Sequence, residues 1–184
     1  MKTVFQYLLI PALLIANVSF INAQEKSQLV NSEVSFFSEA PLENIEAHNK
    51  YAKGIIDWKT NNFSFRIPIK DFVFKKSLMQ EHFNENYMES DKFPNATFKG
   101  KMDGDYNLKK SGTYQVTATG EIEIHGVKQQ RTIPATIEVK GKTVTVSSSF
   151  KVELEDHEIE IPTIVFSKIA EIIEVTLKGE LKEI

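Results

Sequence analysis

The sequence contains no cysteine among its 184 residues. A disulfide scaffold is therefore excluded, and so is lipid modification of an N-terminal cysteine. Basic residues are also too few and too scattered for nucleic-acid binding, because 22 lysines and arginines stand against 25 acidic residues without forming a basic stripe. The formal net charge of −3 would be repelled by anionic phospholipid surfaces. We expect no nucleic-acid partner, and any contact with lipid to involve an enclosed molecule.

Metal-ligating and catalytic motifs are missing as well. The chain has four histidines, and no two have a metal-ligand spacing: His48, His82, His125 and His157. Asp103–Asn107 starts like a calcium loop, but Leu108 stands where the glycine belongs, which favours a hairpin turn. No serine is framed by glycines as in a nucleophile elbow. We therefore predict no metal, no cofactor and no enzymatic activity.

The first 23 residues read as a secretory signal peptide. Lys2 supplies the charged start, residues 4–20 are almost uncharged and apolar, and Ala23 offers a small residue before the predicted cleavage site. A retained membrane anchor is the alternative, although Pro11 and nearby polar residues shorten the apolar run. Cleavage predicts a periplasmic or secreted protein, with no stable membrane insertion. Residues 24–184 would then form a single domain.

The rest of the sequence alternates apolar and polar residues with a period of two, which is typical of strands with one buried face. Residues 113–124 show this most clearly, and the turn at His125-Gly126 followed by resumed alternation to residue 139 predicts a long hairpin. Further strands are expected over residues 29–38, 42–48, 51–58, 61–74, 93–101, 144–154 and 173–181. In the strand over 61–74, Pro68 predicts an edge or a bulge, and a shift of phase places that bulge near Lys70 and Asp71.

One segment breaks this rhythm and predicts a helix over residues 77–89. Ser77 to Gln80 resembles a capping box, and five residues then share one helical stripe: Leu78, Met79, His82, Phe83 and Tyr87. Glu81 and Glu85 flank His82, which we interpret as a helix-face residue with a backbone or carboxylate partner; contact with a ligand headgroup is the alternative. A weaker helix is expected over residues 167–172. Eight or so antiparallel strands with one main helix predict a small up-and-down β-barrel.

Three stretches resemble the YceI-like family in the order expected for it. Residues 78–98 resemble the family's helix with a His-Phe pair that leads into a proline-containing strand. Residues 120–128 resemble its strand-turn element, and residues 150–162 resemble an element that ends in proline. The resemblance implies a lipocalin-like antiparallel barrel with a long apolar cavity for polyisoprenoid lipids. His157 stands where the family more often has tyrosine, and the usual opening motif is replaced by residues 34–39, which leaves the ligand open.

The 13 phenylalanines favour an apolar site, although aromatic residues also fill ordinary cores. Many of them crowd around the predicted helix, where rigid rings can line a slot. We predict a ligand-binding wall formed by Phe63, Phe65, Ile67, Phe72, Phe74, Met79, His82, Phe83, Phe98, Val116 and Ala118. Small inward residues such as Ala118 and Gly120 suit either a ligand channel or a close contact between strands.

The predicted function is sequestration or transport of one long apolar lipid, such as a polyprenyl quinone, inside the barrel. The alternative is a structural or protein-interaction barrel of the cell envelope, related to stress, whose core is filled. That alternative predicts no continuous cavity. A homodimer is left open.

Overall fold

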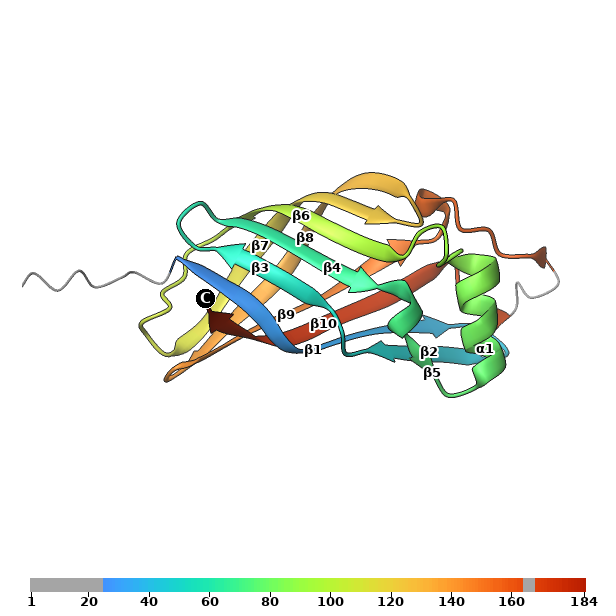
Figure 1. Cartoon of the computed structure of the whole chain (residues 1–184), viewed down its shortest axis with the longest axis horizontal. Helices are drawn as coiled ribbons and strands as arrows, with labels where there is room; N and C mark the ends of the chain where they lie inside the picture. Colours follow the sequence, from blue (N-terminus) through green and yellow to red (C-terminus); the bar gives the residue numbers. More distant parts are fainter. Residues whose placement is uncertain (1–24, 164–167) are drawn as a thin grey trace, which may run out of the picture.

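The computed structural model describes residues 25–163 and 168–184. The predicted signal peptide lies outside these residues. Ten strands make up most of the described chain: β1 (Lys26–Glu39), β2 (Asn44–Asn49), β3 (Lys53–Asp57), β4 (Asn62–Pro68), β5 (Val73–Phe74), β6 (Asn95–Asp103), β7 (Gly112–Ile124), β8 (Val127–Lys140), β9 (Thr143–Glu153) and β10 (Ile172–Glu183). They form one antiparallel sheet that is elongated along the strands (Figure 1).

Eight of these strands close into a barrel, in the order β1, β3, β4, β6, β7, β8, β9 and β10. The ring closes because β10 pairs with β1 from Ser27↔Glu183 to Phe37↔Glu174. The predicted antiparallel eight-strand barrel with one main helix is confirmed. Closure leaves an interior wide enough for packed side chains or for one slim ligand.

Strand β1 takes part in two pairings along its other edge. Its first residues, Lys26–Gln28, pair with β3, whereas residues 34–39 pair with β2. Between these two parts the register with β10 shifts, and Asn31 adopts a left-handed conformation with φ of 48°. A bulge of this kind bends a strand and increases its twist. The barrel wall at the far end of β1 is therefore extended by β2 and by β5, which pairs with β2.

The single strand predicted over residues 61–74 is wrong. Strand β4 ends at Pro68, a 3₁₀ turn follows over Ile69–Asp71, and β5 pairs with β2 instead of continuing along β6. The phase shift seen in the sequence therefore marks a corner of the chain and no simple bulge. Asn49 is fully buried and supports this corner, because its Nδ2 donates a hydrogen bond of 2.6 Å to the Pro68 carbonyl oxygen.

The main helix runs from Ser77 to Tyr87 in two parts, α1 (Ser77–His82) and a π-helical turn (Phe83–Tyr87). The predicted capping box does not form, because Lys76 occupies the N-cap position without a side-chain cap. Gln80 accepts a hydrogen bond of 3.2 Å from the Phe74 backbone N–H instead. Of the weaker predicted helix, Ser167 lies outside the described residues and Ile172 is the first residue of β10.

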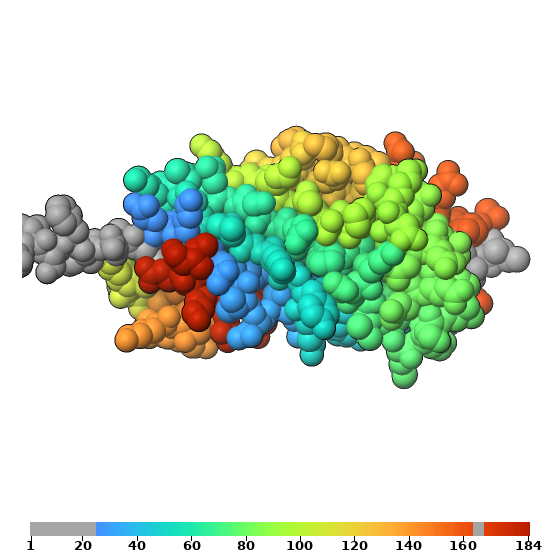
Figure 2. Space-filling model, viewed as in Figure 1, coloured from blue at the N-terminus to red at the C-terminus, as the bar shows by residue number. Residues whose placement is uncertain are grey.

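The barrel is filled at the end away from α1, where both the start of β1 and the C-terminus lie (Figure 1). Trp58 donates a hydrogen bond of 2.9 Å from Nε1 to the Ser27 hydroxyl and packs on Tyr106 with ring centroids 5.4 Å apart. Buried aliphatic residues complete this core: Leu29, Ile56, Met102, Val116, Ile137, Val139, Val144 and Leu181. Figure 2 shows an unbroken surface on the face of the molecule that is viewed. The segment that contains α1 (green) covers the end of the barrel opposite to this core. Within the described residues, no helix has the length and apolar character needed to cross a bilayer.

Candidate functional site

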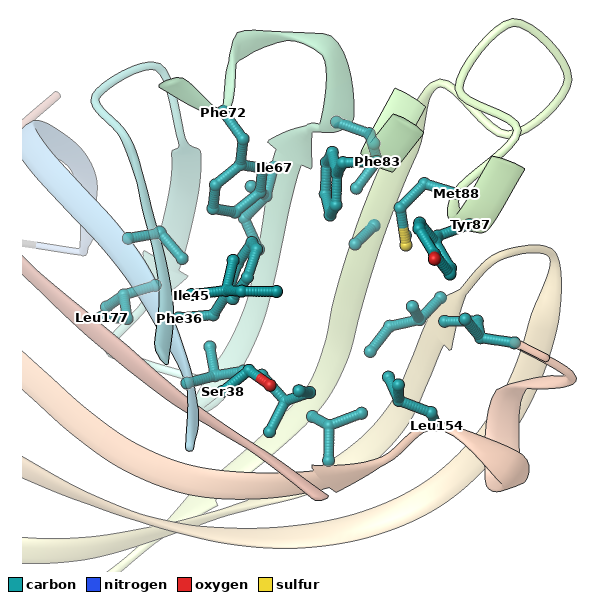
Figure 3. Close-up of a pocket in the computed structure, with 18 of the residues that line it drawn as sticks. Phe36, Ser38, Ile45, Ile67, Phe72, Phe83, Tyr87, Met88, Leu154 and Leu177 are labelled. Atoms are coloured by element: carbon teal, nitrogen blue, oxygen red, sulfur yellow. The ribbon is translucent and has the colours of Figure 1, made fainter. Parts of the chain in front are cut away.

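The other half of the barrel, on the α1 side, contains an apolar cavity of about 500 Å³. That volume lies in the range of small-molecule binding sites, roughly 300–1,000 Å³. Side chains from strands on all sides and from the helix point into the same space (Figure 3). The labelled residues that do so are Phe36, Ser38, Ile45, Ile67, Phe72, Phe83, Tyr87, Met88, Leu154 and Leu177.

One side of the cavity is a cluster of four phenylalanine rings. Phe83 stacks on Phe36 with centroids 5.5 Å apart, and its ring also lies 4.9 Å from Phe74 and 5.7 Å from Phe72. Phe36 in turn contacts Phe72 at 5.3 Å and Phe74 at 5.7 Å. The cluster joins β1, the corner after β4 and the helix. Rings held by each other in this way form a stiff wall.

The π-helical turn determines which helix residues reach the cavity. The Met88 N–H donates to the carbonyl oxygen of Phe83 at 2.9 Å, five residues back. The wider turn brings both Tyr87 and Met88 to the cavity, together with Leu78, Met79, His82 and Phe83 from the predicted stripe. Burial raises the pKa of the Tyr87 hydroxyl, so this group stays neutral in the ordinary pH range.

Polar side chains gather where the cavity meets the solvent beside the helix. Lys76 and Glu43 form an ion pair with Nζ and Oε1 2.5 Å apart. His82 and Lys168 also line this edge, and buried Ser38 accepts a hydrogen bond of 2.9 Å from the Ala170 N–H. We call Glu43, Lys76, His82 and Lys168 the rim. The arrangement is apolar within and charged only at the edge, as an amphiphile requires.

Nine of the eleven residues predicted for the binding wall line the cavity: Phe65, Ile67, Phe72, Phe74, Met79, His82, Phe83, Phe98 and Ala118. Phe63 and Val116 do not line it, because they lie deeper along their strands in the filled half. Phe63 packs there against Phe98 at 4.8 Å and Phe65 at 5.9 Å. Their alternation correctly predicts an inward direction, but not their depth along the barrel axis.

The prediction missed a large part of the wall contributed by β1, β9 and β10. These residues are Val34, Phe36, Phe150, Val152, Val175 and Leu177. The residues of β9 and β10 belong to the alternating segments 144–154 and 173–181, which the sequence predicts as strands. Closure of the barrel is what brings them opposite the predicted wall, and no local pattern reports it.

Gly120 resolves an alternative that the sequence left open. It faces Gly100 across β6 and β7, and a Cβ on Gly120 would lie 2.0 Å from the Lys99 carbonyl oxygen. Gly120 therefore permits a close strand contact, whereas Ala118 lines the cavity. Among the described residues, no three His, Asp or Glu side chains are grouped so that they could hold a metal ion.

Comparison with known proteins relates this geometry to a family. The YceI-like domain matches residues 26–181. A polyisoprenoid binding domain from Saccharophagus degradans, implicated in plant cell wall breakdown, superposes with a TM-score of 0.75 at 13% identity, covering 87% of this chain and 99% of its own. BcnA of Burkholderia cenocepacia superposes with a TM-score of 0.68 at 16% identity, covering 82% of this chain and 95% of its own. The YCEI protein of Campylobacter jejuni superposes with a TM-score of 0.61 at 19% identity, covering 79% of this chain and 89% of its own.

No curated protein matches the sequence. The three structures share the fold, and the domain match covers nearly all of the described barrel. The chain belongs to the YceI-like family.

Proposed function

We propose that this protein is an exported carrier that encloses the chain of a polyisoprenoid-type lipid in the α1 half of its barrel. The observation that supports this most directly is the apolar cavity of about 500 Å³. A relative with the same fold is described as a polyisoprenoid binding domain. Family membership suggests a binding protein without catalytic activity, which agrees with the absence of catalytic motifs noted in the sequence.

The cavity wall supplies the driving force for such binding. Each buried methylene contributes roughly 0.8 kcal/mol, so about ten buried carbons give about 8 kcal/mol before the cost of association. A polar anchor is therefore not required for affinity. Specificity for a slim, branched chain would come from the stiff phenylalanine cluster, which resists collapse into the empty space.

The headgroup of the lipid would lie at the rim. Lys76, Glu43 and Lys168 offer both signs of charge at the edge of the cavity, and His82 adds a donor or acceptor. A polyprenyl quinone, whose ring carries carbonyl acceptors, is the ligand we propose. The filled-core alternative predicts no continuous cavity, so the hollow half of the barrel argues for the carrier.

Lipid extraction tests the proposal directly. The protein is purified from the exported fraction of its host, extracted with organic solvent, and the extract is identified by mass spectrometry. We expect a prenyl lipid in near-stoichiometric amount. Protein that carries no lipid and also fails to take up added prenyl quinones would contradict the proposal.

A matched pair of variants tests the site. Phe83→Asp places a charge inside the cavity and is expected to reduce lipid retention about tenfold or more, because a carboxylate in apolar surroundings is strongly unfavourable. Phe37→Asp makes the same change on the outer face of β1, where Phe37 is 36% exposed, and should retain lipid. Far-ultraviolet circular dichroism checks that both variants keep their strands. Equal retention in the two would remove the helix from the site.

A further inference from the structure

In the described part of the chain, the barrel wall has a long interruption between β8 and β9. These strands pair from Lys140↔Thr143 to Thr136↔Ser147, and the pairing stops there although both strands continue. Residues 127–135 of β8 stay paired with β7, and residues 148–153 of β9 stay paired with β10. Their facing edges share no ladder pair. We call this interruption the β8–β9 seam.

Pro134 lies two residues beyond the last ladder pair, and its lack of an N–H removes one possible ladder donor. The two strands are linked across the seam by side chains instead. Ser148 donates from Oγ to the Pro134 carbonyl oxygen at 2.7 Å, and Arg131 donates from Nη2 to the Lys151 carbonyl oxygen at 2.7 Å. Each contact connects one side chain with one backbone group.

The short helix η3 (Glu155–His157) closes the far end of the seam. Gln129 donates to the Asp156 carbonyl oxygen at 2.9 Å, and Arg131 pairs with the Asp156 carboxylate at 3.3 Å. The His157 ring also lies against β8, with Nδ1 3.3 Å from the Val127 carbonyl oxygen. In Figure 1 this helix lies beside the β7–β8 turn, at the end of the barrel that carries α1.

The cavity lies directly behind the seam. Ile133 and Ala135 of β8, and Ser148, Phe150 and Val152 of β9, all line it. A second pocket lies at the same place, lined by residues 134–136 of β8 and 147–149 of β9 with one residue each from β7 and β10, and it shares Ala135 and Ser148 with the cavity. At this point two small side chains, Ala135 and Ser148, line both spaces.

We propose that the β8–β9 seam is a lateral gate through which the apolar chain of the lipid enters and leaves the cavity. Widening the two neighbouring junctions, β7–β8 and β9–β10, would break continuous backbone ladders, whereas widening the seam breaks only the side-chain contacts described above. The paired segment from residue 136 to residue 147 acts as the hinge. This proposal rests on the carrier function, and it differs from passage beside the helix at the rim.

Cysteine pairs test the gate cleanly, because the natural chain has no cysteine. Ala135→Cys with Ser148→Cys closes the seam beside its hinge when oxidised. Lys140→Cys with Thr143→Cys is the matched control, since it joins the same strands at a ladder pair and leaves the seam free. Lys76→Cys with Glu43→Cys closes the rim instead.

The measurement is the rate at which a fluorescent farnesyl lipid moves between phosphatidylcholine vesicles and the stripped protein. Oxidising the seam pair is expected to slow uptake and release about tenfold relative to the same variant in its reduced form, and a reductant should restore the rates. The control pair should exchange at the wild-type rate. Unchanged rates with the seam disulfide confirmed by mass, or slowing by the rim pair alone, would overturn the gate.

A second variant covers the case in which the seam pair does not oxidise. Arg131→Gln removes the ion pair with Asp156 and the bond to Lys151, so release should become several-fold faster. An unchanged release rate in this variant contradicts the gate. If the wild-type protein binds neither the farnesyl lipid nor longer prenyl lipids, the carrier function itself fails; binding with unchanged rates refutes only the gate.

Discussion

At the scale of single residues, Gly100 and Gly120 show how closely the strands of the barrel approach each other. They are register partners in β6 and β7, and a Cβ on either would lie within 2.1 Å of a backbone oxygen of the opposite strand. Gly120→Ala is therefore expected to lower the free energy of unfolding by on the order of 3 kcal/mol, measured by urea denaturation. Gly141→Ala is the control, because its Cβ meets no atom within 4 Å and the cost is limited to a left-handed φ, about 1 kcal/mol. Equal losses would contradict a clash between the strands.

His157 makes folding sensitive to acid. Burial lowers the pKa of its imidazole below the ordinary value of 6.5, against smaller opposing effects of the Val127 carbonyl and Asp156. The unfolded chain then binds a proton at pH values where the folded protein keeps the ring neutral, so the free energy of unfolding falls as the pH drops below about 6.5. His157→Gln retains a donor for Val127 and should lose less stability between about pH 7.5 and about pH 5.5 in urea unfolding. The same loss in both proteins would exclude His157 as the cause.

Sequence patterns predict the direction of side chains better than their depth. Period-two alternation correctly places Phe65, Phe98 and Ala118 inside the barrel, because it follows from local strand geometry. It cannot show that Phe63 and Val116 lie in the filled half, since depth depends on how the strands are staggered around the ring. The functions of Ala118 and Gly120 also depend on which strand lies opposite each of them.

At the scale of elements, the corner between β4 and β5 takes the chain from the barrel to its pairing with β2, and it contributes Phe72 to the phenylalanine cluster. Asn49 links both sides, since it donates to the Pro68 carbonyl oxygen and accepts from the Tyr51 N–H at 2.8 Å. Asn49→Ala leaves both backbone groups without this partner, so we expect a loss of about 2–3 kcal/mol in the free energy of unfolding. Ser64→Ala, on the exposed face of β4, should change it by less than about 0.5 kcal/mol. Urea denaturation of both variants gives the comparison, and a loss in the Ser64 variant as large as that in the Asn49 variant would contradict this assignment.

For the helix, the sequence predicts the position and the apolar face but not the π-helical turn. Its position and its apolar stripe follow from the 3.6-residue period, and all five predicted stripe residues reach the cavity. The π-helical turn does not follow, because local propensities scarcely distinguish i→i+5 from i→i+4 bonding. Met88 was missed for this reason. The end of the strand at Pro68 does not follow from the sequence either. The change of phase is visible there, but it does not show that the next strand, β5, pairs with β2.

At the scale of the whole molecule, the barrel divides into a filled half that holds the fold and a hollow half that is free to bind. Val116 and Ala118 are neighbours on the inner face of β7, one on each side of that division. Val116→Ala should open a void in packed surroundings and lower the free energy of unfolding by on the order of 2 kcal/mol, with lipid content unchanged. Ala118→Leu should do the reverse: its added carbons fill empty space, so the lipid-free protein stays as stable or gains stability while lipid content falls.

Thermal unfolding of the lipid-stripped variants, together with lipid per protein by mass spectrometry, separates the two effects. A lipid that binds only the folded state stabilises it in proportion to the logarithm of its concentration, so adding lipid should raise the melting temperature of wild type and Val116→Ala but scarcely that of Ala118→Leu. Loss of lipid in Val116→Ala as large as in Ala118→Leu would mean that the ligand reaches into the filled half. The assignment of stability to one half of the barrel and of binding to the other would then be wrong, because the same side chains would contribute to both.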